Sequence, residues 1–123
     1  MATLTESLPH TGGFLIREGN GDISRDVVTV AKHSLTYTSG TVLAEVSISG
    51  KYARYDNGAS DGTQTAKAVL WDDVDATAND AAGVVIARLA TINKAELVFR
   101  NDQDADDKAA AYADLATVNI IAR

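Results

Sequence analysis

The stretch that most constrains the fold of this 123-residue chain covers residues 40–62. Apolar residues alternate with polar or small ones in its first half, a glycine and a lysine interrupt the run at 50–51, and a second extended run continues to residue 55. Alternation of period two indicates half-buried strands. Asn57-Gly58 and Asp61-Gly62 follow, and both dipeptides are typical of turns that need positive φ. We therefore predict a β-hairpin with an elaborated tip.

The other periodic segments predict further short strands and one helix. Strand patterns occupy residues 24–31, 66–71, 84–90, 95–100 and 118–121. The third and fourth of these would form a second hairpin, in which Leu97 and Phe99 share a face. Residues 108–115 predict a short helix, because aspartates crowd the turn before it, where the helix dipole favours negative charge. Its apolar face would carry Ala109, Tyr112, Ala113 and Ala116. The fold class is α+β, dominated by short antiparallel strands.

The first 23 residues differ in composition from the rest of the chain. They contain the only proline, several glycines and one apolar island, Phe14-Leu15-Ile16, and such a segment cannot build a core. It is either a loosely held terminus or an arm that adds a strand to a partner, with Phe14 and Ile16 on one face and Leu15 on the other. We expect residues 1–23 to form an arm that contributes little to the core. Residues 24–123 suit a single domain.

Charge and composition exclude several classes of protein. A formal net charge of -6 has the wrong sign for binding phosphate backbones, so direct nucleic-acid binding is disfavoured. The absence of cysteine excludes disulfides and thiolate metal sites. No apolar run is long enough to span a membrane, and the first residues lack the features of a signal peptide. We therefore expect a protein made and kept in the cytoplasm of its producer cell, with no membrane partner.

The acidic and histidine-containing motifs do not predict catalysis. Residues 102–107 begin like a calcium loop, but Asp107 stands where the loop needs glycine and Ala113 where it needs glutamate. The aspartates after residues 66–71 are typical of a solvated turn. His33-Ser34 is an adjacent pair, which rarely gives the geometry of a base and a nucleophile. We predict no catalytic residue, no metal and no cofactor, and hence no enzyme.

The aromatic residues leave two interpretations open. Trp71 ends a predicted buried strand and is expected in the core, but with Tyr52 and Tyr55 it could form a stacking platform for a ligand such as a carbohydrate. Arg54 points away from Tyr55 if the strand is regular, and it would serve a subunit contact or remain a solvated edge charge. We retain Tyr52, Arg54 and Tyr55 as possible interface residues. A small β-rich ligand-binding module is the alternative function.

The order of these features resembles the lambda gpD-like family of head decoration proteins of tailed phages. The resemblance rests on a Gly-x-Val-Leu strand, a Gly-Lys-Tyr strand with a following Tyr-Asp, the two turns, the Ala-rich strand at 66–71 and the acidic segment at 104–108. It extends over about residues 24–123.

The resemblance implies a small barrel-like or tulip-like body and a structural role. A member of this family would bind the outer capsid surface as a homotrimer at three-fold positions and stabilise the expanded shell against packaged DNA. The arm would contact the major capsid protein, and its contact residues would be Phe14, Leu15, Ile16 and Arg17. The protein would then reside on the capsid exterior of the virion, and in the host cytoplasm during assembly.

Overall fold

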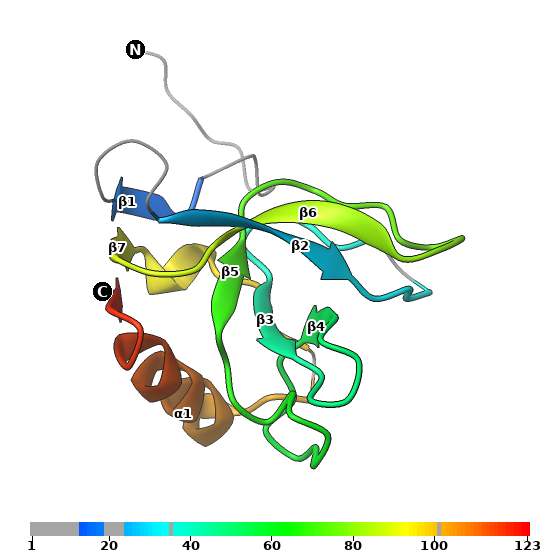
Figure 1. Cartoon of the computed structure of the whole chain (residues 1–123). Helices are drawn as coiled ribbons and strands as arrows, with labels where there is room; N and C mark the ends of the chain where they lie inside the picture. Colours follow the sequence, from blue (N-terminus) through cyan, green and yellow to red (C-terminus); the bar gives the residue numbers. More distant parts are fainter. Residues whose placement is uncertain (1–12, 19–23, 35, 101) are drawn as a thin grey trace.

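The computed structural model describes residues 13–18, 24–34, 36–100 and 102–123, which form two sheets and a helix (Figure 1). The strands are β1 (Leu15–Glu18), β2 (Arg25–Val30), β3 (Val42–Glu45), β4 (Tyr52–Arg54), β5 (Ala68–Leu70), β6 (Ala81–Ile86), β7 (Ala90–Ile92) and β8 (Ile120–Ala122). A 3-10 helix covers Lys94–Glu96, and α1 covers Ala105–Ala116. The predicted α+β class, with short strands and one C-terminal helix, is confirmed.

Five strands close into a barrel in the order β2-β4-β3-β5-β6. Neighbouring strands are antiparallel except β2 and β4, which are parallel. Closure pairs every barrel strand on both sides, so the barrel itself offers no free edge to another chain. Its interior is filled by aliphatic side chains that include Val30, Leu43, Leu70 and Val85. The barrel that the family resemblance implied is therefore confirmed.

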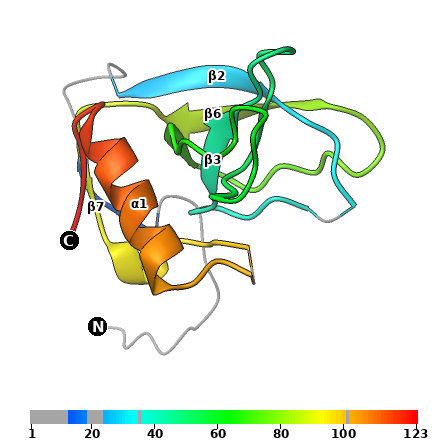
Figure 2. The ribbon, with the colours of Figure 1, turned by 90° about the horizontal axis from the view of Figure 1, so that it is seen from below.

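A smaller sheet and α1 pack together at one end of the barrel. Its order is β1-β7-β8, with β7 antiparallel to β1 and parallel to β8. Figure 2 shows α1 next to β7 on one side of the molecule, with the barrel strands β2, β3 and β6 on the other. A second buried cluster joins these parts, and it includes Phe14, Ile92, Leu115 and Ile120 from the sheet end together with Val69 of the barrel.

The predicted hairpin in residues 40–62 forms, but its turn lies earlier than expected. β3 and β4 pair antiparallel, with Leu43 opposite Arg54, and residues 46–51 make the turn with Gly50 at a φ of 72°. The Asn-Gly and Asp-Gly dipeptides lie in the loop after β4. This loop lies against the end of β3, because a Cβ on Gly62 would lie 2.4 Å from the carbonyl oxygen of Glu45. Only glycine fits there, and its φ of 109° requires glycine as well.

The predicted second hairpin is wrong. The predicted strand at 84–90 is divided between the end of β6, which pairs with β2 and β5, and the first residue of β7, which pairs with β1 and β8. Residues 95–100 continue from the 3-10 helix into an extended segment that bonds the start of β3, because the Val98 N–H donates to the Gly40 carbonyl oxygen at 2.9 Å. Leu97 and Phe99 both pack on the core cluster at the sheet end. Their alternation therefore reflects burial and not strand pairing.

α1 begins with a capping box that the aspartate-rich turn predicted only in part. The Asp107 N–H donates to the Asp104 carboxylate at 2.9 Å, and the Asp104 N–H donates to the Asp107 carboxylate at 3.0 Å. The apolar face was wrong: Ala111 and Leu115 are buried, whereas Ala109 is exposed. Alanine on every side of the helix leaves little apolar contrast from which to choose a face. Within the described residues, no helix has the length and apolar character to cross a membrane.

We expect Asp104→Ala to reduce the free energy of unfolding by about 1 kcal/mol, because the substitution removes the N-cap acceptor of α1. Asp106→Ala is the matched control, since Asp106 is also an acidic residue of the first turn but lies outside the capping box. Urea denaturation followed by circular dichroism measures both changes. Equal losses in the two variants would show that the cap adds nothing beyond the helix dipole.

Candidate functional site

β1 presents its apolar residues differently from the predicted alternation. Phe14 is 2% exposed and packs edge-on against Trp71, with ring centroids 6.4 Å apart, whereas Ile16 is 57% exposed. Leu15 lies opposite Ile92, and Arg17 lies opposite Thr91, so β1 uses two residues where β7 uses one. Such a bulge breaks the period of two. The prediction that Phe14 and Ile16 share a face is therefore wrong.

The segment around β1 belongs to the folded body. The Asn93 N–H donates to the Phe14 carbonyl oxygen at 2.7 Å, and the Arg25 guanidinium donates twice to the Glu18 carboxylate, at 3.0 and 2.6 Å. The expectation that this part of the arm adds little to the core is wrong for Phe14, whose side chain is part of the core. Residues 1–12 and 19–23 of the predicted arm lie outside the described residues.

β1 also forms an outer edge of its sheet. Among the described strands it pairs with β7 alone, so the backbone groups on its other side can accept a further strand. Ile16 and Arg17 are the exposed side chains of this strand. An apolar side chain and a cation beside an open edge are suited to contact with another protein.

The three residues retained as an interface occupy different environments. Tyr55 is 1% exposed, and its hydroxyl donates to the Asp107 carbonyl oxygen at 2.9 Å. Burial, reinforced by the charges of Asp114 and Asp107, raises the pKa of Tyr55 to about 12. Tyr55 is therefore a core residue and not an interface residue in this structure. Tyr52 is half-buried on β4, and Arg54 is half-buried beside a pocket.

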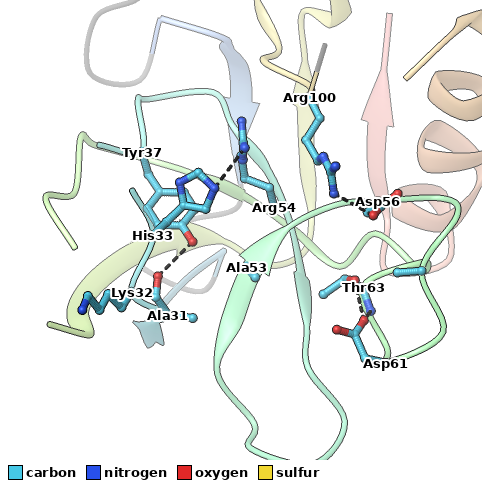
Figure 3. Close-up of a pocket in the computed structure, with 11 residues that line it drawn as sticks. Ala31, Lys32, His33, Tyr37, Ala53, Arg54, Asp56, Asp61, Thr63 and Arg100 are labelled. Atoms are coloured by element: carbon cyan, nitrogen blue, oxygen red, sulfur yellow. Dashed lines mark hydrogen bonds and ion pairs between the residues drawn. The ribbon is translucent and has the colours of Figure 1, made fainter. Parts of the chain in front are cut away.

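The pocket beside Arg54 has a volume of about 320 Å³ and is open on one side (Figure 3). Arg54 Nη2 lies 3.1 Å from His33 Nε2, and Arg100 Nη1 donates to Asp56 Oδ2 at 2.6 Å. The Tyr37 hydroxyl donates to the Ala31 carbonyl oxygen at 2.9 Å, which holds its ring against His33. The sequence pattern identified Arg54 but missed this pocket, since its walls come from segments far apart in the chain.

The aromatic stacking platform considered from the sequence is wrong. Tyr55 lies inside the core, so it cannot share an exposed face with Tyr52. Trp71 is half-buried, packs on the core cluster that contains Phe14, and carries the Arg25 guanidinium 3.9 Å from its ring centroid. The prediction that Trp71 belongs to the core is thus confirmed in part, because Trp71 lies at the edge of the core. A carbohydrate ring would have to displace Arg25 from Trp71 before it could stack there.

The acidic residues are engaged in local structure. The Asp73 carboxylate accepts from the Ser39 N–H at 2.8 Å. Hydrogen bonds from the hydroxyl and N–H of Thr77 lower the pKa of Asp75. Hydrogen bonds from the Asp104 N–H and the Asn57 side chain likewise lower the pKa of Asp107. In the part of the chain that the structure describes, no three His, Asp or Glu residues are grouped so as to hold a metal ion.

The closed barrel, the edge of β1 that pairs with β7 alone among the described strands, and the pocket beside Arg54 define a small β-rich protein. A family model described as bacteriophage lambda head decoration protein D matches residues 3–120. The chain belongs to this family, as the resemblance indicated. A comparison with curated proteins gives no match. Family membership supports a structural role in capsid decoration, on the exterior of the virion.

Proposed function

We propose that this protein binds the outer capsid surface as a homotrimer at three-fold positions and stabilises the expanded shell against packaged DNA. The observation that carries the proposal is the family match over residues 3–120. The net charge of -6 supports contact with the shell and not with the DNA inside it, because an acidic protein gains nothing from counterion release on a phosphate backbone.

In this proposal, residues 1–23 supply the capsid contact, and β1 is the part of this segment that is packed on the body formed by residues 24–123. The open edge of β1 accepts a strand of the major capsid protein, and the exposed side chains of Ile16 and Arg17 contact that strand. Phe14 and Leu15 support this contact indirectly, because they pack in the core and hold β1 in place. Backbone hydrogen bonds then provide affinity, and the two outward side chains provide specificity.

Stabilisation of the shell follows from multivalency. When one arm of a trimer is bound, the other two arms meet neighbouring capsid subunits at high effective concentration, and avidity exceeds the affinity of one arm by about a hundredfold or more. A protein that binds only the expanded shell lowers the free energy of that state by mass action. The bound trimer therefore opposes both contraction and rupture of the expanded shell.

Co-sedimentation with purified shells tests the proposed function. We expect saturable binding to expanded shells, weak binding to unexpanded shells, and a solution mass of three times 12.9 kDa in analytical ultracentrifugation. Coated expanded shells should also release DNA at a higher temperature than bare ones. Equal binding to both kinds of shell would contradict the role in stabilising the expanded state, and a monomer at micromolar concentration would contradict the trimer.

A further inference from the structure

The pocket beside Arg54 contains a cation that has no carboxylate partner among the described residues. Arg54 is half-buried on β4, and its guanidinium lies 3.1 Å from His33 Nε2. A guanidinium only donates hydrogen bonds, so Nε2 is the acceptor of this one. In the part of the chain that the structure describes, Arg54 therefore has a hydrogen-bond partner but forms no salt bridge, and its guanidinium has further N–H donors for a second acceptor.

Salt bridges join five other cations of the described chain to carboxylates: Arg25 to Glu18, Lys51 to Asp80, Lys67 to Glu45, Arg88 to Asp26, and Arg100 to Asp56. Among the described residues, Arg54 forms no such pair. Arg17 and Arg123 form none either, but both are exposed, whereas Arg54 is half-buried. Partial burial weakens the hydration of a cation, so a half-buried guanidinium gains more from an added anion than a fully exposed one does.

The acids that line or border this pocket are already engaged. Asp56 binds Arg100, and the Asp61 carboxylate accepts from the N–H and hydroxyl of Thr63 at 3.1 and 2.6 Å. Asp80 binds Lys51, and it also accepts from the Lys32 N–H at 2.8 Å. Each of these three carboxylates therefore already has donors other than Arg54. The exposed side chain of Lys32 adds a second positive charge to the same wall of the pocket.

We propose that this pocket binds a carboxylate presented by another protein chain, either an Asp or Glu side chain or a chain terminus. Arg54 supplies the main contact, because its planar fork matches a carboxylate, and Lys32 supplies additional charge. Tyr37 and His33 hold the guanidinium in place. The carboxylate would come from a second copy of this chain or from a capsid subunit, and this part of the proposal rests on the proposed function. The preference of the pocket for a carboxylate does not depend on that function.

An NMR titration of the full chain with sodium acetate tests the chemistry. We expect saturable shifts of the Arg54 side-chain signals with acetate and none with sodium chloride at equal ionic strength. Arg54→Gln should weaken acetate binding about fivefold, and Lys32→Ala about twofold. Arg88→Gln is the matched control and should leave binding unchanged, because Arg88 lies outside the pocket and pairs with Asp26. Identical shifts with acetate and chloride would overturn the proposal, as would undiminished acetate binding by Arg54→Gln.

Two further measurements on Arg54→Gln identify the source. A mass that falls toward the monomer, at concentrations where the unmodified protein is a trimer, assigns the carboxylate to a second copy. An unchanged mass with about fivefold weaker binding to expanded shells assigns it to a capsid subunit. If mass and shell binding both stay unchanged while acetate binds, no protein carboxylate occupies the pocket and the proposal fails. If the unmodified protein binds no shell, the proposed function fails while the acetate result stands.

Discussion

Replacing Phe14 with alanine is expected to reduce the free energy of unfolding by about 3–5 kcal/mol. Phe14 is 2% exposed, it packs against Trp71, and it joins the cluster that holds the small sheet and α1 to the barrel. Truncation would leave a cavity at this junction, because the surrounding backbone is held by the pairing of β1 with β7. Urea denaturation of the purified protein measures the loss.

Ile16→Ala provides the control for Phe14→Ala. Ile16 lies two residues after Phe14, on β1, but is 57% exposed, so its truncation should change the free energy of unfolding by less than about 0.5 kcal/mol. Similar small losses in both variants would show that Phe14 does not belong to the core. The segment would then be a detachable arm, as the sequence alone suggested.

The strands of the barrel could be predicted where local pattern and burial agree. Residues 24–31 and 66–71 alternate or run apolar, and the structure places β2 and β5 inside these ranges. The hairpin of β3 and β4 was also predictable, because a break in the pattern at residues 50–51 coincides with a glycine of positive φ. In these segments the local preference and the tertiary environment favour the same conformation.

The errors arise where long-range packing overrides the pattern. The bulge in β1 depends on its register against β7, more than 70 positions later in the chain, so the sequence of the island gave no sign of it. Residues 95–100 alternate like a strand because Leu97 and Phe99 pack on the core, although the backbone bonds only the start of β3. Period two reports which side chains are buried; it does not report which backbone is paired.

Of the residues that line the pocket, the sequence singled out Arg54 and not the neighbours that the fold brings to it. Arg54 attracted attention because a cation stood between two tyrosines, yet its partner, His33, lies 21 residues away. Tyr55 was retained as a possible interface residue because aromatic residues are favoured as interface anchors, but it lies in the core, where its hydroxyl donates to the Asp107 carbonyl oxygen. Whether Arg54 or Tyr55 faces solvent depends on how the barrel closes and where α1 packs, and neither can be read from the local sequence.

The double variant Ile16→Asp with Arg17→Glu is expected to bind expanded shells about tenfold more weakly or worse, with an unchanged melting temperature. Both side chains are exposed, so the body keeps its core, but the edge of β1 changes from apolar and basic to acidic. A capsid strand that fits the unmodified edge would then face two carboxylates. These repel acidic groups of the strand and lose their hydration against its apolar groups. The effect multiplies over a trimer, because all three arms carry the change. Co-sedimentation over a range of protein concentrations measures the loss.

Ile48→Asp is the matched control for this double variant, because Ile48 is 97% exposed in the turn between β3 and β4, within the barrel part of the chain. It repeats the Ile→Asp half of the change on a different surface, so shell binding should stay within about twofold of the unmodified protein if β1 carries the contact. A reversed result, with Ile48→Asp impaired and the β1 variant binding normally, would place the capsid contact on the barrel. The net charge falls by about one in Ile48→Asp and by about three in the double variant, so losses of binding free energy in that same ratio would mean that the shell responds to net charge and not to the edge of β1.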